Sequence, residues 1–353
     1  FGRQLLHSRV EFDTDPPLVF PEEFPMRFEA ANASICDEDG NLLFYSNGVY
    51  IANHLHEPME NGTGLVFGPF LNAWANGGAR HPQILLALPT SSESSLYHFL
   101  YLPTDTMAAD NIYGYTVLSF GLYSSMIDMS ENEGAGRVVS KNNLVIADTL
   151  DNGKLTAMRH ANGRDWWVLV WEDFTNRYYR LLVTPDTILN LGLQAIGDTI
   201  PSGLGQAAFS PDGTKYARLN LYQLGGDQYI DLYDFDRCSG LLSNPRHFTY
   251  RDTALAGGLA FSENSRFLYV PSFRFTYQID TEADDVMASM QVIGSVFDIP
   301  EPNPFFNAQL APDGKVYISF GGTKDSLSVV HHPNKRSQAC QFSYAGFPLA
   351  ANN

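Results

Sequence analysis

Short apolar runs, separated by turn residues, recur along the whole chain. Clusters of Gly, Pro, Asn and Asp bound these runs, which is typical of β-strands joined by tight turns. No long segment combines a 3.6-residue hydrophobic period with helix caps. The pattern therefore predicts an all-β protein. The clearest runs are Leu42–Tyr45, Leu96–Tyr101, Trp166–Trp171, Tyr229–Tyr233 and Phe267–Val270.

A short phrase repeats within this pattern. It consists of an apolar run, a polar turn of the Ser-Pro-Asp-Gly type, and a hydrophobic strand containing Tyr or Trp. We interpret the Pro, Asp and Gly of the phrase as hairpin-turn residues. A unit of about 50 residues with four short strands is typical of a β-propeller blade, because one such sheet cannot bury both of its faces alone. Corresponding turn positions are Gly163, Gly213, Ser265 and Gly314.

The repeat length sets the expected number of blades. A chain of 353 residues divided by about 50 favours one β-propeller domain over residues 1–353 with seven blades, and six blades are the alternative. The interval from Gly40 to Gly163 is too long for two plain blades, so we expect loop insertions in the first two. The two chain ends are expected to close the remaining blade. The expected blades lie at about 30–75, 80–150, 154–200, 203–250, 256–298 and 305–345.

Composition excludes several classes of partner. The chain has 22 Lys and Arg against 39 Asp and Glu, a formal net charge of -17. Such an acidic surface repels nucleic-acid phosphates and anionic lipids, so we expect neither partner. No apolar run of about 18 residues is present, so no membrane insertion is predicted. Hydrophobic residues make up 44% of the chain, which is enough for a large core.

The chemistry-bearing residues give no recognisable catalytic or metal motif. Three cysteines without a CxxC pair allow at most one disulfide and argue against a zinc cage. His54 and His56 alternate as two ligands on one strand face would, but they lie in a polar loop, so no metal and no cofactor is predicted. Gly-x-Ser-x-Gly, His-Glu-x-x-His and phosphate-loop motifs are absent. The 39 acidic residues leave a paired-carboxylate glycosidase open.

Several phrases together resemble one family. The chain is similar to the N-terminal β-propeller region of large secreted surface proteins of the Bacteroidetes, in which PKD-like repeats and a type IX secretion sorting domain follow the propeller. The resemblance implies an extracellular or outer cell-surface location and carries over no catalytic residue. The phrases are Ile35–Ile51, Met59–Leu65, Lys154–Trp167, Gly203–Tyr216 and Ile230–Pro245.

Two sets of candidate site residues follow. In a propeller, the innermost strand of each blade lines a central channel, and amide or hydroxyl side chains there could bind a sugar or satisfy buried backbone groups. The channel-lining candidates are Gln83, Thr156, Gln206, Asn307 and Gln309. Asp-Ser/Thr-apolar triplets are similar to the O-glycosylation signal of exported proteins of that phylum, although Asp-Thr is also a common turn pair. These candidates are Thr106, Thr149, Thr187, Thr199, Thr253 and Ser326.

The sequence therefore favours a secreted or cell-surface propeller that is not an enzyme. Its expected role is a non-catalytic binding or assembly module in an extracellular structure, in adhesion, or as a subunit of a surface layer or fibre. Its partners would be other extracellular proteins or further copies of itself, and surface carbohydrate is a further option. The alternative is an extracellular propeller enzyme of the glycosidase, lyase or lactonase type that uses the channel mouth.

Overall fold

A computed structural model describes residues 5–66, 68–69, 77–91, 94–108, 115–221, 226–252, 257–297, 299–300, 302–322 and 324–351. Regular structure in these residues is almost entirely β-strand. Two short 3₁₀ helices, η1 (Asn132–Gly134) and η2 (Ser337–Cys340), are the exceptions with defined bounds. The all-β prediction is confirmed.

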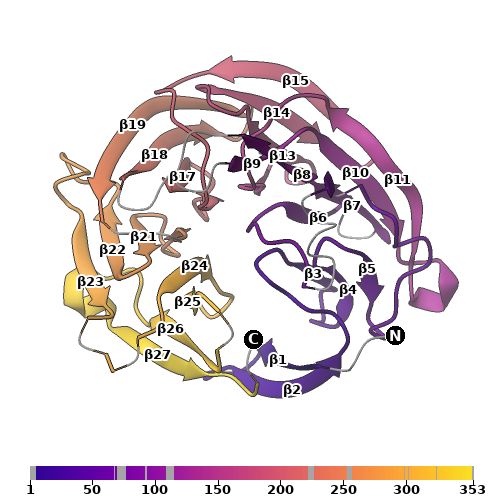
Figure 1. The fold of residues 1–353 in the computed structure, drawn as a ribbon, viewed down its shortest axis with the longest axis horizontal. Helices are drawn as coiled ribbons and strands as arrows, with labels where there is room; N and C mark the ends of the chain where they lie inside the picture. The colour runs from indigo at the N-terminus through magenta and orange to yellow at the C-terminus, as the bar shows by residue number, and fades with distance from the viewer. Residues whose placement is uncertain are drawn as a thin grey trace. The chain divides into compact units, whose positions relative to one another are not determined.

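Six antiparallel sheets of three or four strands follow one another along the chain, and each has the strand meander of a β-propeller blade (Figure 1). Blade 1 contains β3 (Ala33–Cys36), β4 (Leu42–Ser46) and β5 (Ile51–Asn53). Blade 2 contains β6 (Leu85–Pro89), β7 (Leu96–Tyr101), β10 (Leu122–Asp128) and β11 (Arg137–Ile146). Blade 3 contains β12 (Ala157–Arg159), β13 (Trp166–Trp171), β14 (Arg177–Val183) and β15 (Ile188–Ala195).

The second half of the chain repeats the same meander. Blade 4 contains β16 (Ala207–Phe209), β17 (Lys215–Leu221), β18 (Asp227–Asp236) and β19 (Leu241–Arg251). Blade 5 contains β20 (Ala260–Phe261), β21 (Phe267–Ser272), β22 (Phe275–Asp280) and β23 (Gln291–Ser295). Blade 6 contains β24 (Phe305–Leu310), β25 (Val316–Phe320), β26 (Ser326–Val330) and β27 (Phe342–Pro348).

The blades belong to two compact units. Unit 1 includes Pro25–Ser202 and Asp236–Leu241, and it therefore holds blades 1 to 3 and the β18–β19 turn. Unit 2 is Gln4–Phe24, Gly203–Phe235 and Leu242–Asn353, and it holds most of blade 4 together with blades 5 and 6. Each unit has its own apolar core, with Phe44, Phe99 and Val168 fully buried in unit 1 and Leu219 and Val270 fully buried in unit 2.

Burial in blade 3 is greatest at its second strand and least at its outer strand. In blade 3, β13 (sequence WWVLVW) is buried at five of its six residues, whereas most residues of the outer strand β15 are exposed or half-buried. A strand covered on both faces needs a continuous apolar run, which is why four of the five clearest runs in the sequence lie on second strands and the fifth, Tyr229–Tyr233, lies on the third strand β18. The outer strand has solvent beside it and tolerates polar residues.

The repeated Pro-Asp-Gly phrase forms the hairpin between the first and second strands of a blade. In blade 4, Ser210 accepts the amide of Gly213 and Asp212 accepts the amide of Thr214 at 2.9 Å. Gly213 has φ +70°, and Ser265 takes the corresponding left-handed conformation with φ +62° in blade 5. The turn interpretation of the phrase is confirmed.

The favoured count of seven blades is not supported, and the alternative of six is. The first strands, β1 (Leu5–Glu11) and β2 (Leu18–Phe24), pair only with each other among the described residues, and β27 is the outer strand of blade 6. The two ends of the chain meet instead through one side chain, because Ser8 Oγ accepts the amide of Ala351 at 2.9 Å and donates to its carbonyl at 3.2 Å. The hairpin therefore packs on blade 6 without joining its sheet.

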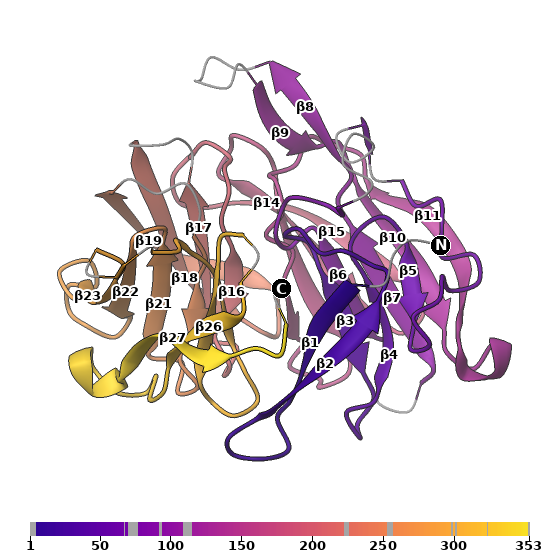
Figure 2. The ribbon, with the colours of Figure 1, turned by 60° about the horizontal axis from the view of Figure 1, so that its bottom comes forward.

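Insertions in the first two blades account for the remaining length. The hairpin of β8 (Thr104–Ala108) and β9 (Tyr115–Ser119) is inserted between β7 and β10 and extends away from the blade 2 sheet (Figure 2). Blade 1 has three strands, and the loop after β5 links it to blade 2. In that loop, Asn61 Nδ2 donates to the Val138 carbonyl at 2.7 Å, and Lys141 Nζ donates to Asn61 Oδ1 at 2.8 Å.

Candidate functional site

Gln206, a channel-lining candidate, acts as a structural bridge inside unit 2. Its Oε1 accepts the amide of Leu259 at 3.2 Å and that of Ala308 at 2.9 Å, so one carboxamide links the first-strand segments of blades 4, 5 and 6. A Cβ on Gly258 would lie 2.0 Å from this oxygen, so only glycine fits beside it. The side chain thus satisfies two backbone donors that the strand ladders leave unpaired.

The other four channel candidates occupy different environments. In unit 2, Asn307 Oδ1 is buried and has no hydrogen-bond partner, whereas Gln309 is exposed. In unit 1, Gln83 and Thr156 are half-buried, with Gln83 two residues before β6 and Thr156 directly before β12. The Gln83 carbonyl accepts the amide of Leu155 at 2.8 Å, which holds these two segments together. A ligand-binding role for the five residues stays a prediction.

The glycosylation candidates differ in accessibility. Thr106, Thr187 and Thr199 are exposed, whereas Thr149 and Ser326 are half-buried. The carboxylates that precede Thr106 and Thr149 accept the amides of those threonines at 2.7 and 2.8 Å, which is the turn-forming role of an Asp-Thr pair. Thr253 lies outside the described residues, and modification of the others stays a prediction.

A group of buried and half-buried polar side chains lies in unit 1, where the chain enters blade 3. We call it the Lys154 cluster, and it consists of His81, Asp151, Asn152, Lys154, Asp173 and Ser202. Lys154 Nζ lies 3.1 Å from both carboxylate oxygens of Asp151, and their side chains are only 1% and 3% exposed. Sequence reasoning missed this pair, because Asp-Asn-Gly-Lys reads as a solvated turn.

Three segments of unit 1 hold the Lys154 cluster in place. Leu150 forms antiparallel bridges to Ser119 on one side and to Glu172 on the other. These bridges set the Asp151 and Asp173 backbones on neighbouring segments, with the Asp173 amide donating to the Thr149 carbonyl at 3.0 Å. The turn then rises through two left-handed residues, Gly153 at φ +78° and Lys154 at φ +63°.

The electrostatic environment of the cluster favours the uncharged forms of Asp173 and His81. Burial, and then the charge of Asp151, raise the pKa of the Asp173 carboxyl above its ordinary value, although the Ser202 hydroxyl donates to it. Burial, and then the charges of Lys154 and Arg80, lower the pKa of His81 to about 4, so this imidazole is neutral at physiological pH. A carboxyl with a raised pKa is a possible proton donor and acceptor.

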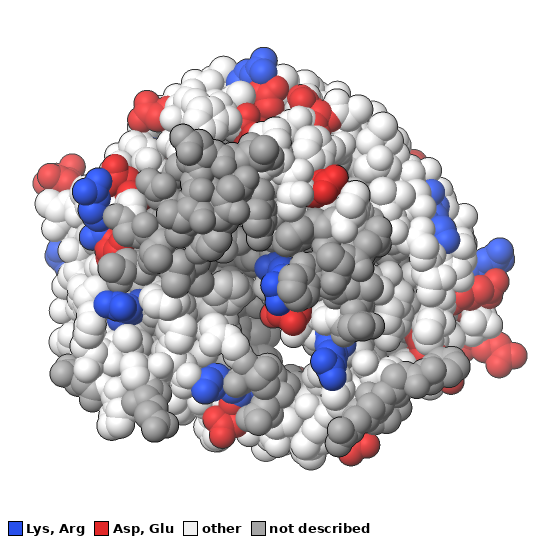
Figure 3. All heavy atoms as spheres, in the orientation of Figure 1, with Lys and Arg blue, Asp and Glu red and all other residues white. Residues whose placement is uncertain are grey.

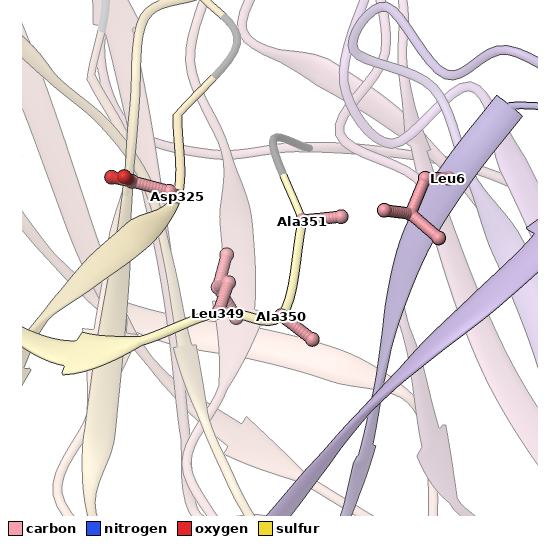
Figure 4. Close-up of a pocket in the computed structure, with 5 residues that line it drawn as sticks. All are labelled: Leu6, Asp325, Leu349, Ala350 and Ala351. Atoms are coloured by element: carbon pink, nitrogen blue, oxygen red, sulfur yellow. The ribbon is translucent and has the colours of Figure 1, made fainter.

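A second candidate is a shallow hollow of about 450 Å³ in unit 2. Its lining consists of Leu6 from β1, Asp325, and the segment that follows β27 (Figure 4). One carboxylate is the single charged group among its lining residues. Apolar side chains and a lone exposed carboxylate do not define a chemistry.

Metal and charge patterns add little. In the described part of the chain, no three His, Cys, Asp or Glu side chains are placed to hold a metal ion. The ring of His56 contacts Tyr45 instead, with 3.1 Å between Nδ1 and the phenol oxygen. The described residues include no helix with the length and apolarity needed to cross a membrane. Acidic and basic side chains are interspersed on the face drawn in Figure 3.

The blade sheets define the chain as a β-propeller protein, and comparisons with solved structures agree. No protein-family model and no curated protein matches the chain significantly. It is similar to a putative 6-phosphogluconolactonase from Bacteroides fragilis, with a TM-score of 0.53, 10% identity, and coverage of 99% of this chain and 96% of that chain. A second protein of that description, from Bacteroides uniformis, has a TM-score of 0.51, 11% identity and coverage of 99% and 97%.

The fold is shared more widely than one activity. Hydrazine synthase from Kuenenia stuttgartiensis is similar with a TM-score of 0.51, 11% identity, and coverage of 93% of this chain and 86% of that chain. Because proteins with different activities share the propeller at such low identity, these likenesses show the fold alone.

Proposed function

We propose that this chain is a secreted or cell-surface β-propeller that acts as a non-catalytic binding and assembly module. Its partners would be other extracellular proteins, surface carbohydrate or further copies of the chain. The observation that carries the proposal is the apolar character of two outer strands in unit 1.

The outer strands β11 and β15 expose five large apolar side chains. Leu189, Leu191 and Leu193 of β15 are 42%, 43% and 39% exposed. On β11, which is in contact with β15, Val139 and Leu144 are 47% and 54% exposed. Isolated exposed apolar residues are normal, but a group of them on adjoining strands is typical of a protein-binding surface.

The geometry of these strands restricts how a partner would bind. The ladder of β15 shifts register between Tyr179 and Leu181, and the ladder of β11 shifts register at Ser124 and Met126 of its partner strand. Such bulges interrupt the free hydrogen-bonding edge and disfavour addition of a further strand. A partner would therefore cover the apolar side chains and would not extend the sheet.

The Lys154 cluster supports a non-catalytic role. The Lys154 ammonium and the Asp151 carboxylate contact each other and are almost completely buried. A substrate could reach neither group without opening the turn.

Sedimentation of the full chain over a wide concentration range, with cell-surface binding measured in parallel, tests the proposal. We expect self-association or surface binding that weakens in the triple variant L189S/L191S/L193S and persists in the control Ala195→Ser, which adds a hydroxyl to the same exposed strand. A chain that stays monomeric throughout and binds no surface material, or a triple variant that binds as well as the wild type, would refute it.

The second candidate function is a propeller hydrolase. It is favoured by the raised pKa of Asp173 and by the similarity to proteins described as putative 6-phosphogluconolactonases. If the chain hydrolyses lactones or glycosides, Asp173→Asn should abolish turnover while the exposed control Asp198→Asn leaves it unchanged. Absence of turnover in the wild type removes this candidate.

A further inference from the structure

The contact between Lys154 and Asp151 has the geometry of a reacting pair. Nζ lies at the same distance, 3.1 Å, from Oδ1 and from Oδ2 of Asp151. Two equal contacts to a carboxyl group place Nζ within about 3.5 Å of the carbon between the oxygens, which is the separation of a near-attack conformer. The two residues are three apart in the chain, and the Gly153 turn holds them in this arrangement.

We propose that Lys154 and Asp151 form an intramolecular amide, an isopeptide bond between Nζ and Cγ. In the step, the neutral amine of Lys154 attacks Cγ of the protonated Asp151 carboxyl. An N–C bond forms, a C–O bond breaks, and the departing oxygen leaves as water with one proton from the amine and the proton of the carboxyl group. No oxidant, reductant or cofactor is needed.

Burial removes water from both groups. With side-chain exposures of 1% and 3%, both charges of the ion pair have lost nearly all of their hydration. Transfer of one proton from the ammonium to the carboxylate removes both charges and gives the neutral amine and acid that the step requires. The same exclusion of water protects the product amide from hydrolysis.

A second carboxyl, that of Asp173, interacts electrostatically with both members of the pair. Asp173 lies on the segment paired with Leu150, and its charge interacts with both Asp151 and Lys154. The Ser202 hydroxyl donates to it, which fixes one of its oxygens. Within the proposal, Asp173 therefore acts through its electrostatic interaction with both reacting groups.

The product would stabilise the turn in a particular way. A link across three residues closes a very small loop, so it gains little chain entropy in comparison with a long-range disulfide. Its benefit is the replacement of two buried charges by one neutral amide. The three cysteines of the chain, Cys36, Cys238 and Cys340, are unpaired thiols, so this bond would be a covalent constraint that disulfides do not provide.

Mass spectrometry of the denatured full chain tests the proposal directly. We expect the wild type to be lighter than its sequence mass by one water. Trypsin cuts after Lys141 and Arg159, so the bond predicts a peptide spanning 142–159 that is not cut after Lys154 and whose fragments locate the link. A wild-type chain of full mass, cut normally after Lys154, would overturn the proposal.

Two variants separate the amide from other dehydrations. Lys154→Arg keeps a cation but lacks a nucleophilic amine, so its mass should equal the sequence mass. A succinimide at Asp151, which also forms with loss of one water, would persist in this variant and would be cleaved by hydroxylamine, and that result contradicts the proposal. A succinimide at Asn152 before Gly153 forms with loss of ammonia, so its mass deficit differs from that of the amide. Asp173→Asn should lower the dehydrated fraction of the chain. If K154R does not fold, the wild-type peptide map still decides the question.

Discussion

Two ion pairs of the described residues are almost completely buried on both sides, one in each unit, and they are built differently. Lys154 and Asp151 lie within one tight turn of unit 1. Arg218 and Asp231 in unit 2 face each other across β17 and β18, with side chains 2% exposed on both sides. The first pair is local and held by a left-handed backbone, whereas the second belongs to a regular sheet.

The hydrogen bonds of the two carboxylates explain why only one pair is a candidate for reaction. Asp231 Oδ2 accepts Arg218 Nε at 3.2 Å and an Arg218 terminal nitrogen at 2.8 Å, and His247 Nδ1 lies 2.7 Å from Oδ1. Burial would raise the pKa of Asp231, but the Arg218 charge and the His247 and Arg218 hydrogen bonds outweigh it, so this pKa lies below its ordinary value. A guanidinium stays protonated and is not a nucleophile, whereas a buried lysine can lose its proton.

The largest predicted effect comes from breaking the ion pair between Arg218 and Asp231. Asp231→Ala leaves Arg218 as an uncompensated buried charge, and we expect a loss of about 3–5 kcal/mol in the free energy of unfolding. Urea denaturation followed by fluorescence measures it. The double variant R218M/D231L removes both charges and should lose far less. If single and double variants lose the same free energy, the pair contributes packing and not charge compensation.

The turn that holds Lys154 and Asp151 together gives the next largest predicted loss of stability. A Cβ on Gly153 would lie 2.3 Å from the Pro82 carbonyl oxygen, and its φ is +78°. Gly163→Ala is a matched control, because Gly163 has φ +74° but nothing within 4 Å of an added Cβ. We expect Gly153→Ala to cost about 3 kcal/mol and the control about 1 kcal/mol in denaturant unfolding. Equal losses would show that the turn can move away from Pro82.

Acidification should weaken the ion pair between Arg218 and Asp231. Because the pKa of Asp231 is lowered in the folded state, its stabilising contribution is present above the ordinary carboxyl value of about 4 and is lost as the pH falls through the folded-state value. Urea midpoints measured between neutral and acid pH should therefore fall more steeply for the wild type than for Asp231→Asn. Parallel curves would contradict the lowered pKa.

The sequence predicted those features of the fold that residues determine within their own segment of the chain. The turn phrases around Gly213 and Gly314 predict hairpins, because Pro, Asp and Gly determine the backbone conformation of their own segment. A continuous apolar strand such as Trp166–Trp171 announces burial on both faces. The blade count was less accessible, since β8–β9 and the loop after Asn53 consume residues that the length estimate assigned to a seventh blade.

The candidate site was predicted less well, for a physical reason. Gln206 was singled out by its position before a turn, but its two backbone partners, Leu259 and Ala308, belong to other blades. Burial of Lys154 depends on segments around Pro82 and Glu172 that are distant in sequence, and a lysine after Asn-Gly has the local signature of a surface turn. Long-range burial of a polar residue leaves no mark on its neighbours in the chain.

The smallest predicted effect concerns Asp173, whose contribution to stability depends on pH in the opposite direction to that of Asp231. The pKa of Asp173 is raised, first by burial and then by the charge of Asp151, so its contribution to stability is fully present in acid and is lost as the pH rises through the folded-state value. Asp173→Asn imitates the protonated form and should stabilise the chain at neutral pH by less than about 1 kcal/mol, with no gain in acid. Urea midpoints at both pH values measure the difference, with the exposed Asp198→Asn as control. Formation of the Lys154–Asp151 amide would remove the Asp151 charge, so the gain should be smaller in fully dehydrated protein than in chains that retain the ion pair.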